Sequence, residues 1–395
     1  MKIVIVGSGG REHAMGWAFY REGYDVYYVP GNPGTARHGT NIAEIPDEED
    51  ILVIPGSETY IAGGIADGKD NVFAPDSRGA RLESSKIWAK EFMKKHGIPT
   101  APFIVVNTPK ELKTALKSFS PPYVIKADGL AGGKGVIIED DFEKAVEKGT
   151  MLIEGAFLKG VKGPVVVEEY LPGIELSAMA VASGEHFALF PFTRDYKRAY
   201  DGGKGPNTGG MGAVGPINVD KGIVDQIEDI YRLTLDGLKS EGISYKGFLY
   251  IGLMIKDDKV YVLEYNVRMG DPETEVIVMM NPSGFVSSVL SAYRGESIQP
   301  IVPKCFAVDV VIASEGYPLS PRKGQVIERE PTGFAFYAGV KEESGKLVVS
   351  GGRVFHCMGT GMTPEEARTS AYRCAESVSF PGAFFRRDIG ELIER

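Results

Sequence analysis

The chain has 395 residues, of which 43% are hydrophobic and 25% charged, and its formal net charge is −9 at pH 7. This length exceeds what one hydrophobic core organises, so we expect about two to four domains in a soluble globular protein. The acidic balance disfavours a general nucleic-acid binder. No apolar run is long enough to cross a bilayer or to serve as a signal peptide, and the three cysteines lack disulfide or zinc-site spacing. We therefore expect a cytoplasmic protein that binds neither nucleic acid nor membrane.

Strand and helix patterns alternate over roughly the first eighty residues, which predicts a small parallel α/β domain. Apolar runs predict strands at residues 3–6, 25–29, 42–45, 51–54 and 71–75, and helical spacing covers residues 11–22. Only residues 46–50 separate the third and fourth strands. A parallel crossover needs about a dozen residues or more, so the usual helical connection is excluded there.

A glycine turn, Gly7-Ser8-Gly9-Gly10, follows the first strand. A dinucleotide fingerprint would need a third glycine where Glu12 stands and an acidic residue where Val29 and Pro30 stand, so hydride chemistry is disfavoured. Free backbone N–H groups at the start of the helix could still bind a phosphate. A tight turn required only by packing is the alternative.

A glycine-rich segment lies between the predicted strands at residues 123–125 and 136–138, after a predicted helix at residues 84–96. Its glycines would let the backbone close over phosphates, and its two lysines would place point charges on them. The residues in question are Lys126, Gly132, Gly133, Lys134 and Gly135. A purely structural hairpin is the alternative.

Two further segments carry polar residues in unusual settings. The apolar run at residues 165–167 passes into Glu168, Glu169 and Leu171, and Glu175 follows, a pattern that could present backbone groups to adenine and a carboxylate to ribose. Apolar strands that end in glutamates are also common without a ligand. Asp195 to Arg198 and the loop at residues 205–212 predict a substrate loop.

The most informative stretch runs from Glu264 to Thr274, at the end of an apolar strand. Side chains alternate along a strand, so Glu264, Asn266 and Arg268 should face the same way. Magnesium prefers oxygen ligands shared with phosphates, and the guanidinium fork matches phosphate oxygens. The pattern predicts a metal-and-phosphate face; a polar strand end facing water is the alternative.

The middle unit extends to about residue 301 and contains a long helix near residues 224–238, and a third unit begins after Pro303. It has a predicted strand at residues 305–312, hairpin material around 351–353, and a helix at 364–378 that Thr363 and Glu366 cap. We divide the chain into an α/β domain (1–83), an α+β domain (84–301, with a mobile lid at about 118–185) and a small α+β domain (302–395).

The order of these motifs resembles the ATP-grasp ligases, in which two α+β subdomains clasp ATP. More narrowly, the sequence is similar to the phosphoribosylamine–glycine ligase family over nearly the whole chain. The combination of Pro-Asn-Thr-Gly-Gly-Met-Gly (206–212) with Gly-Asp-Pro-Glu-Thr (270–274) is the most specific part of this resemblance. Other matching stretches are residues 7–14, 30–36, 124–136, 195–198, 245–255, 351–354 and 386–390.

The resemblance implies ATP-dependent ligation of glycine to 5-phosphoribosylamine through glycyl phosphate, by a monomer that uses Mg²⁺ or Mn²⁺. It assigns the metal to Glu264 and Asn266, and catalytic roles to Arg268, Asp271 and Lys197. ATP would contact Lys86, Lys126, Gly132, Gly133, Lys134, Gly135, Glu168, Glu169, Leu171 and Glu175. The two other substrates would contact Gly9, Gly10, Gly31, Asn32, Gly34, Asp195, Asn207, Thr208 and Gly209.

The sequence also departs from the family pattern. Family members carry a helix before the strand at 51–54, and their Gly-Pro-Glu turn is replaced by Pro55-Gly56-Ser57-Glu58, which puts phosphoribosyl contacts from this edge in doubt. Two alternatives remain. One is another ATP-grasp ligase that joins a different carboxylate and amine, and the other is a nucleotide-binding regulator without chemistry.

Overall fold

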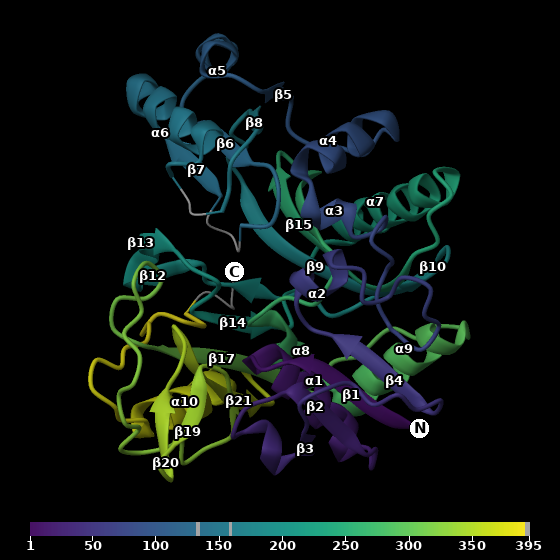
Figure 1. Ribbon diagram of the computed structural model, residues 1–395, viewed down its shortest axis with the longest axis vertical. Coiled ribbons are helices and arrows are strands. Elements are labelled where there is room, and N and C mark those ends of the chain that lie inside the picture. The colour runs from purple at the N-terminus through teal and green to yellow at the C-terminus, as the bar shows by residue number, and fades with distance from the viewer. Residues whose placement is uncertain (132–134, 158–159, 392–395) are drawn as a thin grey trace.

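The N-terminal domain, at the bottom of Figure 1, is a parallel sheet in the order β3-β2-β1-β4, as predicted. The computed structural model describes residues 1–131, 135–157 and 160–391. The elements of this domain are β1 (Lys2–Gly7), α1 (Gly10–Arg21), β2 (Val26–Pro30), the 3-10 turn η1 (Thr35–Arg37), β3 (Thr40–Asn41), β4 (Ile51–Pro55) and α2 (Glu58–Ala62).

Two predicted strands of this domain were wrong in extent. The third strand is Thr40–Asn41 rather than 42–45, and residues 71–75 contribute only a bridge between Val53 and Val72. As expected, the segment from β3 to β4 contains no helix. It crosses from one edge of the sheet to the other as an acidic loop. Two ion pairs hold this loop in place, one between Lys2 and Glu48 (2.7 Å) and one between the N-terminal amine and Asp50 (2.7 Å).

The lid, at the top of Figure 1, is an antiparallel sheet in the order β5-β8-β6-β7 covered by two helices. Its elements are β5 (Phe103–Val106), α5 (Pro109–Leu116), β6 (Tyr123–Ala127), β7 (Val136–Glu139), α6 (Phe142–Glu154) and β8 (Val165–Glu168). This extent differs from the predicted 118–185, because β9 lies in the next sheet. The lid has a core of its own, centred on Leu112, Ile125 and Val167. A separate core allows the lid to move as a unit.

The central domain contains an antiparallel sheet in the order β10-β9-β15-β16. Its elements are α3 (Arg81–Ser84), α4 (Lys86–Lys95), β9 (Ile174–Ser183), β10 (His186–Leu189), α7 (Lys221–Ser240), β15 (Lys246–Lys256), β16 (Lys259–Asn266), α8 (Glu273–Met280) and α9 (Pro282–Arg294). The helix predicted at 84–96 breaks at Ser85, whose Oγ accepts from Trp88 N (3.1 Å) and caps α4.

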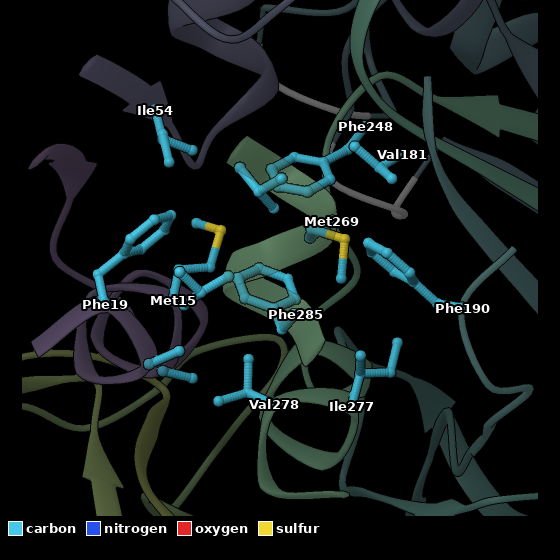
Figure 2. Close-up of a cluster of buried hydrophobic side chains, with 14 of the residues drawn as sticks. Met15, Phe19, Ile54, Val181, Phe190, Phe248, Met269, Ile277, Val278 and Phe285 are labelled. Atoms are coloured by element: carbon cyan, nitrogen blue, oxygen red, sulfur yellow. The ribbon is translucent and has the colours of Figure 1, made fainter. Parts of the chain in front are cut away.

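One core joins the N-terminal and central domains. Figure 2 shows Phe19 of α1 and Ile54 of β4 in the same cluster as Phe248 of β15 and Phe285 of α9. Among the described residues no single helix is long and apolar enough to cross a membrane; the bent pair α8 and α9, which meet at 104°, passes such a test only together.

The C-terminal sheet, in the order β11-β14-β17-β21-β18, is antiparallel and takes two strands from before the predicted boundary at 301. The elements are β11 (Arg194–Asp195), β12 (Arg198–Tyr200), η2 (Asp201–Gly203), β13 (Lys204–Asn207), β14 (Gly212–Gly215), β17 (Phe306–Ala313), β18 (Ala335–Tyr337), β19 (Val340–Glu343), β20 (Lys346–Val349), β21 (Arg353–Gly361) and α10 (Pro364–Ser377).

The hairpin predicted around 351–353 was wrong, because β20 pairs with β19 whereas β21 pairs with β17 and β18. The two glycines there are needed for close packing instead. A Cβ on Gly352 would lie 2.2 Å from the ring of Tyr317. The helix predicted at 364–378 is confirmed as α10, with the capping box of Thr363 and Glu366 in place.

Candidate active site

The end of β16 and the loop that joins it to α8 carry the predicted metal-and-phosphate residues. Glu264 pairs with Gly252 of β15, and the register shifts beside it, so that Leu263 is an extra, bulged residue. The carbonyl oxygen of Leu263 accepts from Lys126 Nζ (3.1 Å). A lysine at the end of β6 in the lid therefore meets the central sheet one residue before Glu264.

Cationic side chains from several elements converge on Glu264. Burial opposes ionisation of this carboxylate, but the charges of Lys197, Lys86, Lys126 and Arg268 hold its pKa below the ordinary value. Glu264 is therefore ionised, among cations that also pair with other carboxylates, Lys126 with Glu168, Lys197 with Asp195, and Arg268 with Glu58 and Glu83. This arrangement suits a polyphosphate and its metal ion.

Arg268 lies beside Asn266, as the strand pattern predicted: its Nη2 donates to Asn266 Oδ1 (3.0 Å). Two carboxylates that sequence analysis missed also hold it, with Nε 3.2 Å from Glu58 Oε2 and Nη2 3.0 Å from Glu83 Oε1. Burial tends to raise the pKa of Glu58, but the charge of Arg268 opposes this effect and the pKa lies below the ordinary value. For Glu83, burial prevails and the pKa is raised. The only sequence signal was Glu58 itself, which stands in the turn that departs from the family pattern.

A second ionic group brings three predicted residues together. Lys197 Nζ lies 2.8 Å from Asp195 Oδ2 and 3.4 Å from Glu175 Oε1. Burial alone would lower the pKa of Lys197, but these carboxylates hold it well above the usual value. Residues assigned separately to adenosine and to glycine thus share one cluster with Glu264.

The carboxylate of Glu168, a predicted ATP contact, forms ion pairs with lysines of the protein instead. It is buried, and it pairs with Lys126 and with Lys90 Nζ (2.5 Å), a lysine that the sequence analysis missed. Burial lowers the pKa of Lys90 to about 8. The N–H of Glu169 donates to Pro102 O (3.0 Å), which leaves its carbonyl for an adenine edge. Leu171 is buried.

Near the glycine-rich hairpin, Lys86 Nζ donates to Gly129 O (3.4 Å), and Gly135 O accepts from Ala127 N (2.8 Å). The predicted phosphate contacts Gly132, Gly133 and Lys134 lie outside the described residues.

A cavity of about 630 Å³ opens where the N-terminal, central and C-terminal domains meet. Seven of the predicted site residues line it: Gly9, Gly31, Asn32, Asn207, Thr208, Gly209 and Asp271. Ser8, Tyr317 and Arg353 line it too and were not predicted. Gly10 and Gly34 are not among the lining residues; a Cβ there would lie 2.4 Å from the side chains of His356 and Tyr337, respectively.

The polar groups of the two glycine loops are largely used within the protein. Asn32 Nδ2 donates to Ser8 O (2.9 Å) and Tyr337 O (2.8 Å), while its Oδ1 accepts from Gly34 N (2.7 Å). The N–H of Gly9, expected to be free for an anion, donates to Glu12 Oε2 (2.7 Å). Asn32 therefore shapes the cavity wall, and Glu12 occupies part of the expected anion site.

Arg353 links the substrate loop at residues 205–212 to the loop before α8 through hydrogen bonds and an ion pair. Its Nη1 donates to Gly209 O (2.8 Å) and Asp271 O (2.8 Å), and its Nη2 lies 3.0 Å from Asp271 Oδ2. Tyr317 OH accepts from Gly209 N (2.8 Å). The signal in the sequence was the Gly-Gly-Arg stretch at 351–353, which belonged to the resemblance but received no role.

Three family models match this chain: the N domain of phosphoribosylglycinamide synthetase over residues 1–83, its ATP-grasp (A) domain over 84–274 and its C domain over 307–392. A phosphoribosylamine–glycine ligase of Thermotoga maritima is 56% identical over 98% of this chain and 99% of its own length. One from Clostridium acetobutylicum is 38% identical, covering 99% of this chain and 100% of its own.

The solved structures agree with these matches. The crystal structure of the phosphoribosylamine–glycine ligase from Thermotoga maritima has a TM-score of 0.94 at 54% identity, over 98% of this chain and 100% of that chain. The biotin carboxylase domain of the Hydrogenobacter thermophilus 2-oxoglutarate carboxylase, solved with MgADP, has a TM-score of 0.72 at 18% identity, over 97% of this chain and 91% of that chain. This second similarity supports the ATP-grasp fold alone.

Proposed function

This chain belongs to the phosphoribosylamine–glycine ligase family, ATP-dependent carbon–nitrogen ligases that form glycinamide ribonucleotide in purine biosynthesis, and we propose how its residues share the work. ATP phosphates bind between the lid and Glu264, phosphoribosylamine binds in the cavity of about 630 Å³, and glycine lies between them. The observation that carries this division is the convergence of Lys86, Lys126, Lys197 and Arg268 on Glu264.

We assign Mg²⁺, or Mn²⁺, to Glu264 and Asn266. The donor set fits, because Glu264 is ionised and the Asn266 amide oxygen accepts one hydrogen bond from Arg268, which leaves a second lone pair. Both are the hard oxygen donors that Mg²⁺ shares with substrate phosphates. The ion would neutralise charge on the transferring phosphoryl group when bound.

The cavity supports the phosphoribosylamine assignment by its position. The loop from Val267 to Asp271 leads directly from the phosphate face to the cavity wall, so the two reactants meet along it. Lys197 and Asp195 lie in the cluster with Glu264 and are suited to hold the carboxylate and the amino group of glycine, respectively. Gly10 and Gly34 support the walls of this site.

The chemistry follows from the poor reactivity of a carboxylate. An amine that attacked glycine directly would have to expel oxide, whereas an acyl phosphate expels phosphate. The lysines hold the ATP γ-phosphoryl group in line with a glycine oxygen, because phosphoryl transfer depends mainly on positioning and electrostatics. The amine of phosphoribosylamine then attacks the acyl carbon of glycyl phosphate. Closure of the lid excludes water from this intermediate.

Arg268 has a more limited part than its sequence position suggested. The carboxylates of Glu58 and Glu83 already compensate its charge, so it fixes Asn266 and adds a smaller share to phosphoryl stabilisation. We further propose domains at 1–83, 84–301 and 302–395, with β11 and β14 of the middle segment completing the sheet of the last domain, a monomer, and a cytoplasmic location.

The deciding experiment measures ADP release with each substrate omitted in turn. We expect release that requires both glycine and phosphoribosylamine. Release with another carboxylate or amine at equal efficiency would favour a different ATP-grasp ligase, and nucleotide binding without any release would favour a regulator.

A further inference from the structure

A buried group of three carboxylates and one histidine lies behind the substrate cavity, apart from Glu264 and Asn266. Glu275 is on α8, Asp309 on β17 and His356 on β21, and all three are completely buried. Asp271 joins them from the loop before α8, with Oδ1 3.5 Å from His356 Nε2. Ligand atoms of Asp271, Glu275 and His356 all lie within 4.8 Å of one another.

Several polar atoms of this group have no hydrogen-bond partner among the described residues. They are both oxygens of Glu275, Oδ1 of Asp271, Oδ1 of Asp309 and Nε2 of His356. A buried carboxylate without a partner is strongly destabilising, so a structure that keeps two such oxygens on Glu275 calls for an occupant. The glycine at position 10 leaves the space, since a Cβ there would lie 2.7 Å from both Glu275 Oε1 and His356 Nε2.

The histidine is oriented as a metal ligand. His356 Nδ1 hydrogen-bonds to Asp309 Oδ2 (2.6 Å), which directs Nε2 toward Asp271. A carboxylate on one ring nitrogen commonly fixes the tautomer and makes the other nitrogen a better ligand. Asp271 keeps Oδ1 free in the same way, because Arg353 is paired with its Oδ2 (3.0 Å).

We propose that His356 Nε2, Asp271 Oδ1 and the carboxylate of Glu275 bind a divalent transition-metal cation, such as Mn²⁺, Fe²⁺, Co²⁺ or Zn²⁺. One imidazole with two carboxylates suits these ions better than Mg²⁺, which prefers oxygen ligands alone. The charge balance points the same way: within the described part of the chain the ion pairs of the three carboxylates are with His356 and Arg353, and Arg11 and Arg268 act on Asp271 from farther away. The cation ties α8 to the C-terminal sheet and fixes Asp271 at the cavity wall.

The competing occupant is a proton. Burial and the nearby Asp271 carboxylate raise the pKa of Glu275 well above its ordinary value, so a neutral Glu275 would also relieve the repulsion. The two possibilities differ in whether the nucleotide-free protein takes up metal.

The test uses the full-length protein, stripped with a chelator, without nucleotide and titrated with Co²⁺. We expect one equivalent to bind, with a visible ligand-field spectrum and a higher melting temperature. The double variant E275Q/H356N should lose this equivalent, and Asp309→Asn should weaken binding by about 10–100-fold. Glu264→Gln is the matched control, because it removes the proposed nucleotide metal ligand and should leave this equivalent unchanged.

The variant Cys357→Ser is the control for binding of Co²⁺ to a cysteine thiol. It should bind Co²⁺ as the wild type does. If the double variant does not fold, X-ray absorption of the wild type decides, with nitrogen and oxygen neighbours expected around cobalt. The proposal is overturned if the wild type takes up Co²⁺ only with nucleotide, if sulfur neighbours dominate, or if the folded double variant keeps the equivalent.

Discussion

Lys126 Nζ lies 3.1 Å from the main-chain oxygen of Leu263, so a lysine of the lid contacts the strand that carries Glu264. The lid packs around its own core, and this bond is a polar link between the lid and the central sheet. Phosphates that enter between the two would replace it with charge-assisted contacts to Lys126 and Lys86. We therefore expect nucleotide binding to be coupled to lid position.

The first prediction concerns that coupling. Amide hydrogen exchange in residues 126–131, which begin the glycine-rich segment, should slow when Mg-ATP is added, because phosphates order the backbone around Gly129. Mass spectrometry of peptides from this range measures it, and the exposed end of α10 serves as an internal reference. Equal exchange with and without nucleotide would mean that the segment is a structural hairpin.

The second prediction concerns the metal face. Glu264→Ala should lower turnover by at least about a hundredfold, since it removes a charged group directed at the phosphates, and Asn266→Ala should act less severely. Turnover is measured over a range of magnesium concentrations, with thermal melts to confirm folding. Glu147→Ala, an exposed glutamate of α6, is the control. Near-normal activity of Glu264→Ala at low magnesium would contradict the assignment.

Sequence patterns anticipated the elements that depend on local physics. Hydrophobic periodicity located α1, α7 and α10, and the cap at Thr363 marked the start of α10 correctly. The order of motifs identified the family because two rare loops occur together. The alternation rule also placed Asn266 next to Arg268.

Long-range partners could not be predicted in the same way. Lys90 looks like any polar residue of an amphipathic helix, and only the arrangement of α4 against the lid brings it to Glu168. The prediction of a free N–H group at Gly9 was wrong for a related reason. Sequence analysis noted Glu12 only as the position of a missing glycine, whereas in the structure its carboxylate accepts a hydrogen bond from the Gly9 N–H. Non-local pairs such as Arg268 with Glu58 depend on tertiary structure that no single segment encodes.

The third prediction concerns pH and Lys90. Its pKa is about 8 in the folded protein, against 10.5 as the ordinary value. Between pH 8 and pH 10.5 Lys90 is protonated in the unfolded chain but mostly neutral in the folded protein, so the free energy of unfolding should rise with pH. Below about pH 8 Lys90 is protonated in both states and no such rise occurs. Relative to Lys90→Met, the wild type should gain up to about 3 kcal/mol between pH 7.5 and 10.

Urea denaturation of both proteins at several pH values measures this gain, and the comparison cancels the titration of the other lysines. A difference that stays constant across this range would mean that Glu168 keeps Lys90 charged throughout.

The fourth prediction concerns Arg353. Its contacts with Gly209 and Asp271 hold two walls of the cavity together, so Arg353→Met should raise the KM for phosphoribosylamine. Loss of these hydrogen bonds should cost about 2 kcal/mol in kcat/KM, or roughly thirtyfold, while the KM for ATP changes little. ADP release with phosphoribosylamine generated in situ measures both constants.

Arg353→Lys should recover only part of the loss, because a lysine has one nitrogen and cannot bind both the two carbonyls and the Asp271 carboxylate as Nη1 and Nη2 of the guanidinium fork do. Arg322→Met, at an exposed arginine paired with Glu315, is the matched control and should behave as the wild type. Equal increases in the KM for ATP and for phosphoribosylamine would indicate a general loss of structure rather than a cavity role.

The last prediction concerns the order of chemistry. If glycine is activated first, an oxygen-18 atom in its carboxylate must leave with the phosphoryl group, so one label should appear in the released phosphate. Glycine with Mg-ATP alone should give at most a trace of enzyme-bound glycyl phosphate, which hydroxylamine traps as a hydroxamate, because phosphoribosylamine completes the site. Mass spectrometry of the phosphate measures the label, and label found only in the amide product or in water would rule out an acyl phosphate. Formate, bicarbonate or alanine that replaced glycine with equal efficiency would leave ATP-dependent activation intact and overturn the proposed glycine contacts of Lys197 and Asp195.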